Sequence, residues 1–545
     1  MFADDTSTLC AGNSIAVTRD RAQLAANTLV KWARRSKMEV AGQKTQLLVL
    51  SQNPRDAIDS HPRGGWGLQE QQLRAVANGY VRGAIEHAAA AWLPAVSKSN
   101  IEILEREMRA AARIVTGCIH SAPHHGVMAE AGMLPVAARR TALTARMFAK
   151  AAALPPEDPL RAVAMADPPQ RLKLVTGWRQ VGREALRELR VELPVEALLP
   201  ERPPPWTPTG KITFNLSIGA LPAGAARSTK RDAALHHLAS MTQCATWAWT
   251  DGSSSGGILR GGAGVLIVGA DDSRTELRVP AGTLCSSFRA EMVALQVTLD
   301  HILEHQRDAP EPVIICTDSL SALAALREGP SAQRSARGAA IWKQLLELTA
   351  GDRTVTLQWV PSHCEIPGNE SADALANEAA TLAQEDVMLD VDTIYRAAVR
   401  TARDRAARDR PTYPDPDRKA ATGWYRELMG ARWPSPLTNM DRTTAVDVHQ
   451  IRTGRWSGSA QFLHSIGRNP SADCPQCRNL DCPAARCPLC GEQADTPRHI
   501  LLTCPGLMGV RLRIPAVGNI LPTVEEVRRG DTVAALVAAF RALQS

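Results

Sequence analysis

Between residues 244 and 385, short β-like runs alternate with helical segments, and no other feature of the sequence constrains the fold as much. Three apolar runs come first, joined by turns rich in Gly and Asp, and the later runs alternate with helices. Strands are expected at 245–250, 264–268, 276–279, 313–317 and 355–360, and helices at 287–305, 339–348 and 371–380. This order predicts an α/β domain with a mixed five-stranded sheet flanked by helices.

Four acidic residues of this domain lie where strands end or helices begin. Asp251 and Asp318 each follow an apolar run, and Glu291 and Asp373 lie on expected helices. Each alone is ordinary as a turn residue, a helix cap or a first-turn charge. Together they indicate a ligand site, because open α/β sheets place ligands at the carboxyl ends of strands. Converging carboxylates also repel one another unless cations neutralise them. The set predicts two Mg²⁺ or Mn²⁺ ions acting on a phosphodiester.

His363, in the loop 362–369, is a candidate proton shuttle beside these acids. The motifs around the five residues resemble, in order and spacing, those of the type 1 RNase H family: Trp249-Thr250-Asp251-Gly252-Ser253, Phe288-Arg289-Ala290-Glu291, Thr317-Asp318-Ser319, Trp359-Val360-Pro361-Ser362-His363 and Gly368-Asn369-Glu370-Ser371-Ala372-Asp373. The resemblance implies an RNase H-like fold and cleavage of the RNA strand of an RNA:DNA hybrid. It also implies that Asp251, Glu291, Asp318 and Asp373 are metal-binding catalytic acids, and that His363 is a mobile histidine aiding product release or proton transfer.

The first residues of the chain resemble part of a polymerase. Phe2-Ala3-Asp4-Asp5 is similar to the reverse transcriptase hairpin that carries two adjacent aspartates, and a helical pattern and a strand-like run at 47–50 follow it. The segments 113–117 and 132–135 resemble the region after the palm in non-LTR retrotransposon polyproteins. The family's fingers and its first metal-binding aspartate would precede Met1, so we expect no polymerisation by this chain alone.

A second metal motif lies near the end of the chain, at Cys487-x2-Cys490-x8-His499-x4-Cys504. Two close ligands followed by two from another element suit a tetrahedral Cys3His Zn²⁺ site, and reduced cysteines without metal are the alternative. The motif resembles the Cys-Cys-His-Cys finger that ends many non-LTR retrotransposon proteins. A second metal site is not predicted, because its candidate ligands are irregularly spaced: Cys474, Cys477, Cys482 and His464.

Proline spacing and these motifs suggest the domain organisation. Pro200, Pro203, Pro204, Pro205 and Pro208 mark a boundary, because neither a helix nor a central strand tolerates such a stretch. We expect a truncated reverse transcriptase palm remnant (1–52), a helical thumb- or connection-like region (53–195), a Pro-rich linker (196–240), the RNase H domain (241–385), a helical basic connector (386–470), the zinc motif (471–510) and a C-terminal tail (511–545).

The charge balance mildly favours a nucleic-acid partner. Lys and Arg total 63 against 56 Asp and Glu, which gives a net charge of +7. The Arg-rich stretch 396–410 fits phosphate contacts or, by preference, a solvated helix with internal ion pairs. No apolar run is long enough for a membrane helix and the first five residues lack a basic n-region, so a soluble intracellular protein is expected. The resemblance implies work in the nucleus.

Three functional hypotheses follow. The first is an active ribonuclease H within a truncated retrotransposon polyprotein, bound to RNA:DNA hybrid and other nucleic acid. The second is a remnant that binds nucleic acid without catalytic turnover. The third is reverse transcription with another chain supplying the missing palm, and it rests on Asp4 and Asp5 alone. Protein partners, the insertion target and the oligomeric state have no signature in the sequence.

Overall fold

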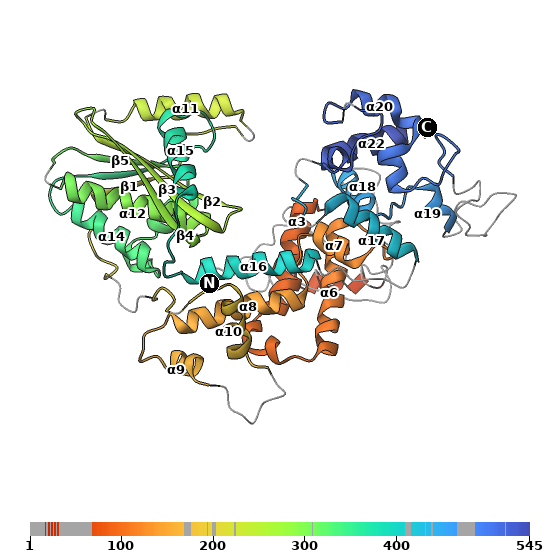
Figure 1. Cartoon of the computed structure of the whole chain (residues 1–545), viewed down its shortest axis with the longest axis horizontal. Coiled ribbons are helices and arrows are strands. Elements are labelled where there is room, and N and C mark those ends of the chain that lie inside the picture. Colours follow the sequence, from red (N-terminus) through yellow and green to blue (C-terminus); the bar gives the residue numbers. More distant parts are fainter. Residues whose placement is uncertain are drawn as a thin grey trace. The chain divides into compact units, whose positions relative to one another are not determined.

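The fold is given by a computed structural model (Figure 1), which describes residues 68–544 apart from 168–175, 193, 199–202, 223–224, 243, 308, 409–415, 431, 438–439, 466–485 and 518, together with parts of 17–31. The chain divides into two compact units. Unit 1 contains the described residues up to 87, those of 98–136 and those from 404 onward. Unit 2 contains the described residues of 88–97 and 137–403.

Unit 2 is built on a mixed six-stranded sheet with the strand order β1-β6-β5-β2-β3-β4. The strands are β1 (Ile212–Asn215), β2 (Thr246–Ser255), β3 (Leu259–Val268), β4 (Arg274–Leu284), β5 (Val313–Thr317) and β6 (Val355–Trp359). β2, β5, β6 and β1 run parallel, and β2, β3 and β4 pair antiparallel. The predicted mixed α/β architecture is confirmed, and its strand count is corrected from five to six, because β1 comes from the segment expected to be only a Pro-rich linker.

Helices cover both faces of this sheet. α12 (Ser287–His305), α13 (Leu320–Arg327) and α14 (Ala336–Leu348) share one buried core with residues of β2, β5 and β6, such as Ala248 and Ile315. On the other face, α11 (Arg227–Ala239) packs near Ile314 and Cys316, and α15 (Pro367–Thr381) packs on β2 and β3. α15 approaches β3 closely at Gly264, where a Cβ atom would lie 2.2 Å from the carbonyl oxygen of Ala372.

The remaining helices of unit 2 form a second core beside the sheet. Residues of α8 (Val136–Ala152) and α10 (Trp178–Glu188) pack with Leu389, Ile394 and Ala398, and Leu284 at the end of β4 packs against this group. The elements that complete this part are α5 (Ala89–Trp92), η3 (Leu93–Ala95), α9 (Pro159–Met165) and α16 (Val391–Arg408). The helical segments that precede and follow the sheet in the sequence therefore share one hydrophobic cluster.

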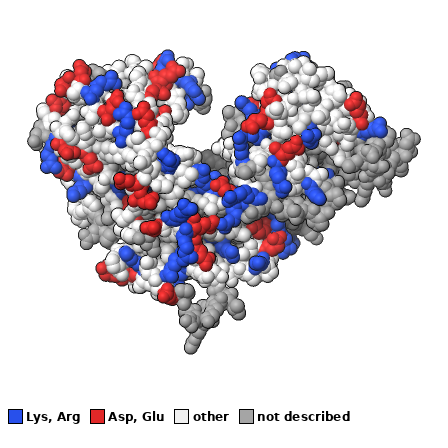
Figure 2. All heavy atoms as spheres, in the orientation of Figure 1, with Lys and Arg blue, Asp and Glu red and all other residues white. Residues whose placement is uncertain are grey.

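Basic side chains gather over α8 and α16, with acidic ones among them (Figure 2). Within this group the ring of Tyr395 has the guanidinium of Arg146 at 5.0 Å from its centroid, and the Tyr395 hydroxyl accepts a hydrogen bond of 3.0 Å from Arg139. Arg400 donates to the carbonyl oxygen of Gly256 in the turn between β2 and β3. The predicted Arg-rich helix is thus present, and part of its basic face packs on the protein itself.

Unit 1 is helical and joins two distant stretches of the sequence. From before the sheet come α3 (Glu70–Val76), η2 (Ala77–Arg82), α4 (Gly83–Glu86), α6 (Lys98–Thr116) and α7 (His124–Glu130). From after it come α17 (Pro416–Met429), α18 (Arg442–Arg452), α19 (Ala460–Ser465), η7 (His499–Thr503), η8 (Pro505–Leu507), α20 (Met508–Arg513), α21 (Val524–Val527) and α22 (Gly530–Gln544). Ala129 of α7 lies in the same core as Tyr425, Ile451 and Phe540. Among the described residues, no helix is long and apolar enough to span a membrane.

A buried charge network links the two stretches of unit 1. His449 lies with Nδ1 2.7 Å from a carboxylate oxygen of Glu130 and Nε2 2.9 Å from one of Glu70. Arg452 donates to the same oxygen of Glu130 at 3.3 Å. Burial lowers the pKa of His449, but the hydrogen bonds and charges of both glutamates outweigh it, so the pKa is raised above its usual value. Both ring nitrogens face acceptors, and the imidazolium form satisfies them together.

Candidate active site

The register of the sheet brings Asp251 and Asp318 together. Thr250 of β2 pairs with Thr317, the last residue of β5, in parallel register, so the residues that follow them, Asp251 and Asp318, lie close together. Glu291 reaches this pair from α12, and Asp373 lies on α15. The four acids line one cavity of about 520 Å³ together with Gly252, Ser253, Ser254, Ser319, Leu320, Ser321, Ser362 and His363. Asp251, Glu291, Asp318, Asp373 and His363, the five residues predicted for this site, therefore line the same cavity.

Three of the acids lie close enough to share a metal ion. One carboxylate oxygen from each of Asp251, Glu291 and Asp318 lies within 4.8 Å of the other two. Glu291 is buried and its Oε2 has no hydrogen-bond partner. A buried acceptor without a partner is costly, and a hard divalent cation is the ligand that such oxygens select. The residues present therefore fit a Mg²⁺ or Mn²⁺ site.

Close packing positions Glu291 against β2. A Cβ atom on Gly252 would lie 2.1 Å from the backbone nitrogen of Glu291, so only a glycine allows α12 to approach the strand this closely. The hydroxyl oxygen of Ser286 accepts a hydrogen bond of 3.1 Å from the amide of Arg289 and caps the start of the helix. The site thus depends on how the first turn of α12 is held.

The pKa values of the acids report burial and mutual repulsion. Burial, followed by the charges of Asp318 and Asp373, raises the pKa of Asp251 to about 7. Burial and the charges of Asp251 and Asp318 raise the pKa of Glu291 well above its usual value. The pKa of Asp318 is also raised by burial, although a hydrogen bond from Asn369 opposes the shift. Clustered acids with raised pKa values are the electrostatic signature of a site that holds positive charge.

Asp373 is held by side chains that the sequence analysis did not select. Asn377, one turn further along α15, donates to Asp373 at 3.2 Å and accepts a hydrogen bond of 2.6 Å from the hydroxyl of Ser253. The four-residue spacing on one helix face is the signal that could have identified Asn377. His363 has a positive φ of 52°, a backbone conformation that is uncommon outside glycine and is found at functional sites.

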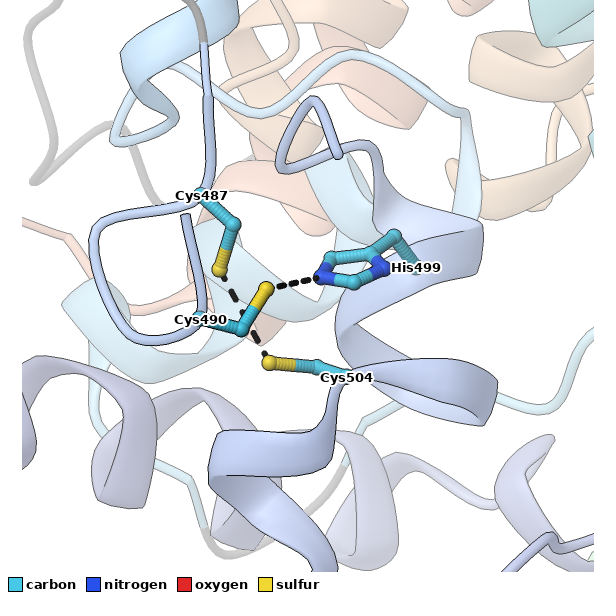
Figure 3. A group of neighbouring side chains, drawn as sticks. All are labelled: Cys487, Cys490, His499 and Cys504. Atoms are coloured by element: carbon cyan, nitrogen blue, oxygen red, sulfur yellow. Dashed lines mark hydrogen bonds between the residues drawn. The ribbon is translucent and has the colours of Figure 1, made fainter. Parts of the chain in front are cut away.

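The predicted zinc ligands also converge (Figure 3). Cys487 Sγ lies 3.7 Å from Cys504 Sγ, Cys490 Sγ lies 3.4 Å from His499 Nε2, and ligand atoms of all four residues lie within 4.8 Å of one another. The Nδ1 atom of His499 lies 3.2 Å from the hydroxyl of Thr503, which leaves Nε2 for a ligand. Three thiols and one imidazole nitrogen are the donor set of a tetrahedral zinc site.

The cysteine cluster lies in an apolar core, and hydrogen bonds hold the backbone around it. Burial raises the pKa of Cys487 to about 12 and also raises that of Cys504. Arg511 is buried and donates to the carbonyl oxygens of Ile500, Leu501 and Cys504, which fixes the turn that carries two of the ligands. The polymerase-like pair Asp4 and Asp5 lies outside the described residues, as do Cys474, Cys477 and Cys482, for which no second metal site was predicted.

The sheet and its acidic cavity define an α/β protein of the ribonuclease H class. The RNase H family model matches residues 243–381. Ribonuclease H of Chlorobium luteolum is 31% identical over 144 residues, which are 24% of this chain and 92% of that protein. Ribonuclease H of Maricaulis maris is 31% identical over 143 residues, 24% of this chain and 89% of that protein. The chain belongs to the ribonuclease H family through this region.

A solved structure also matches the chain. The crystal structure of RNase H1 from the halophilic archaeon Halobacterium salinarum NRC-1 is 25% identical in sequence, and the match covers 25% of this chain and 96% of that one with a TM-score of 0.20.

Proposed function

We propose that this protein is a metal-dependent endoribonuclease that hydrolyses the RNA strand of an RNA:DNA hybrid. The observation that carries the proposal is the convergence of Asp251, Glu291 and Asp318 in one cavity, within a region that belongs to the ribonuclease H family. Asp373 and His363 line the same cavity. The set combines a concentrated negative charge with an imidazole, a group that can donate or accept a proton.

The residues would divide the work as follows. Asp251, Glu291, Asp318 and Asp373 would hold two Mg²⁺ or Mn²⁺ ions, which supply water activation and neutralise charge on the phosphodiester. Asn377 and Ser253 hold Asp373 in place, and the Gly252 contact holds the backbone of Glu291. His363 would deliver a proton to the leaving 3′ oxygen of the RNA.

Cleavage of a labelled hybrid by the purified full chain in Mg²⁺ tests this function. The wild type should cut the RNA strand and leave duplex DNA intact. Asp251→Asn keeps the side-chain size and removes one ligand charge, so it should abolish cleavage. Glu378→Gln, an exposed change on α15 outside the cavity, is the matched control and should cut normally. A folded wild type that binds hybrid but cuts it in neither Mg²⁺ nor Mn²⁺ would favour the alternative, a nucleic-acid-binding remnant without turnover.

We further propose that Cys487, Cys490, His499 and Cys504 hold a structural Zn²⁺ ion. The support is their convergence within the core of unit 1, where Cys487 and Cys504 pack beside Ile500 and Phe540. Such a site stabilises the folded state because the unfolded chain offers no preformed ligand set. Elemental analysis of the purified chain should find zinc, and Cys504→Ser should remove one equivalent. Cys244→Ser, at an exposed free cysteine, should remove none; equal zinc content in all three proteins would refute the assignment.

We also propose an origin in a non-LTR retrotransposon. The support is the order of the motifs, with the ribonuclease H region followed by the Cys3His cluster. Reverse transcription is not part of this proposal, because its only signature in the chain is Asp4 and Asp5. Many dispersed genomic copies of the coding sequence would agree with such an origin, and a single copy at one fixed locus in related genomes would contradict it.

A further inference from the structure

We infer that Glu196 and Asp390, which lie outside the matched region 243–381, position the helix that carries Glu291, and that they act through Arg289. The inference rests on the proposed function, because it assigns a role in holding the metal-binding acids. If these two acids have this role, the helical segments before and after the sheet of unit 2 contribute to the active site.

Arg289 lies two residues before Glu291 and is 5% exposed. Its guanidinium donates to a carboxylate oxygen of Glu196 at 2.8 Å and of Asp390 at 3.1 Å, and to the carbonyl oxygen of Met388 at 3.0 Å. A charged side chain at this depth is stable only when it is paired and hydrogen-bonded. The three acceptors therefore fix where the first turn of α12 lies.

Asp390 ties this turn to the start of α16. Besides Arg289, it accepts hydrogen bonds from the amide and the hydroxyl of Thr393, at 2.8 and 2.7 Å. The Thr393 hydroxyl lies 3.2 Å from that of Ser286, which caps α12. Ser286, Arg289, Asp390 and Thr393 thus form a closed ring between two helix starts, and a change in one member is passed to the others.

Glu196 ties the same turn to the segment before the sheet. Its backbone amide donates to the carbonyl oxygen of Leu389, and the amide of Leu198 donates to that of Ala153 at the end of α8. Val195 is buried in the cluster shared by α8, α10 and α16. The backbone around Glu196 is therefore anchored by these hydrogen bonds and by the burial of Val195.

Arg337 completes the charge balance around this pair of acids. The pKa of Arg337 is lowered, mainly by burial and then by the charge of Arg289. The charges of Glu196 and Asp390 oppose this shift. The two carboxylates and two guanidinium groups together carry no net charge when all four are ionised. Removing the charge of Glu196 leaves an excess of buried positive charge beside the first turn of α12.

The consequence for the site concerns Glu291, which follows Arg289 by two residues in the first turns of α12 and moves with that part of the helix. Side chains that orient a metal ligand change metal affinity about 10- to 100-fold when they are replaced. We therefore expect Glu196→Gln in the full chain to weaken Mn²⁺ binding about tenfold in the absence of substrate. The Mg²⁺ concentration for half-maximal cleavage should rise by a similar factor, while the KM for hybrid stays unchanged.

The experiment measures free Mn²⁺ by electron paramagnetic resonance during a titration of the full chain, with thermal unfolding followed on the same samples. Glu192→Gln is the matched control, because it removes the same charge from an exposed position four residues earlier. Glu196→Asp keeps the charge with a shorter reach and should give an intermediate effect. It also serves as the test variant if Glu196→Gln fails to fold.

The outcomes separate the inference from the proposed function. Weaker Mn²⁺ binding in the Glu196 variants supports the inference, even if the wild type cuts no hybrid and the proposed function is abandoned. Wild-type Mn²⁺ affinity in folded Glu196 variants overturns it, and a lowered melting temperature alone would then mark Glu196 as only structural. An equal effect of Glu192→Gln also overturns it, because the change would then reflect overall charge.

Discussion

At the scale of single residues, the acids of the cavity differ in how they are positioned: some are buried, and Asp373 is hydrogen-bonded to a neighbouring side chain. Asp251 and Glu291 are buried, while Asp373 is partly exposed and accepts a hydrogen bond from Asn377, which in turn accepts one from Ser253. Sequence motifs predicted the acids because their chemistry depends on residue type. The supporting amide and hydroxyl were not predicted, because Asn and Ser are common on any polar surface.

Asn377→Ala should raise the Mg²⁺ concentration for half-maximal cleavage about fivefold, which corresponds to about 1 kcal/mol for one hydrogen bond. The reason is that Asp373 loses the donor that orients it. A Mg²⁺ titration of initial cleavage rates measures the effect, with Glu378→Gln as the control on the neighbouring residue. A Mg²⁺ dependence equal to that of the wild type would show that Asp373 is held without Asn377.

At the scale of elements, the sheet explains what the sequence could and could not predict. The proximity of Asp251 and Asp318 was predictable, because each follows an apolar run that was expected to be a strand, although β2 continues past Asp251 to Ser255. The sixth strand was not, because Ile212–Asn215 is four residues long, follows a Pro-rich stretch and pairs with β6, which is distant in the sequence. Likewise, the contact of Glu196 with Arg289 joins segments that no local pattern connects.

Gly252→Ala should destabilise unit 2 by about 1–3 kcal/mol and abolish cleavage, because the added methyl group overlaps the backbone of α12. Urea unfolding followed by circular dichroism measures the first effect, and the hybrid assay measures the second. Gly210→Ala is a suitable control, since a Cβ atom there meets nothing within 4 Å. Unaltered cleavage by Gly252→Ala would mean that α12 can shift without loss of the site.

At the scale of the whole molecule, the protein combines a unit with the ribonuclease H sheet and a helical unit whose segments come from before and after that sheet in the sequence. The core of unit 1 contains Ala129 from before the sheet and Phe540 from after it. His449 connects the same two stretches through Glu70 and Glu130. The predicted domain boundaries remain predictions, and the grouping of the described residues adds that distant segments share one core.

The stability of unit 1 should be highest in the pH range where His449 is charged and both glutamates are ionised. The raised pKa of His449 gives a stabilisation that is complete below the unfolded value of about 6.5 and is lost as pH rises through the folded value. Burial raises the pKa values of Glu70 and Glu130, but their cationic partners outweigh it and lower them, so their contribution is lost as pH falls. The melting temperature should therefore fall as the pH is raised above this range and as it is lowered below it.

His449→Gln removes the group responsible for the alkaline limb, so it should flatten the decline at high pH and lower stability near neutral pH. Differential scanning calorimetry of both proteins from acid to alkaline pH makes the comparison. His236→Gln, at an exposed position, should keep the wild-type profile. An alkaline decline that persists in His449→Gln would assign it to another group.

The shared core of unit 1 also has a consequence for biosynthesis. The helix α7 leaves the ribosome before the sheet of unit 2, yet residues that share its core, such as Tyr425 and Ile451, are translated only after the sheet. Until His449 and Arg452 emerge, the carboxylate of Glu130 lacks its cationic partners from α18. Nascent chains arrested between the two stretches would therefore expose apolar helices that chaperones bind, and the nuclease sheet would complete its folding first.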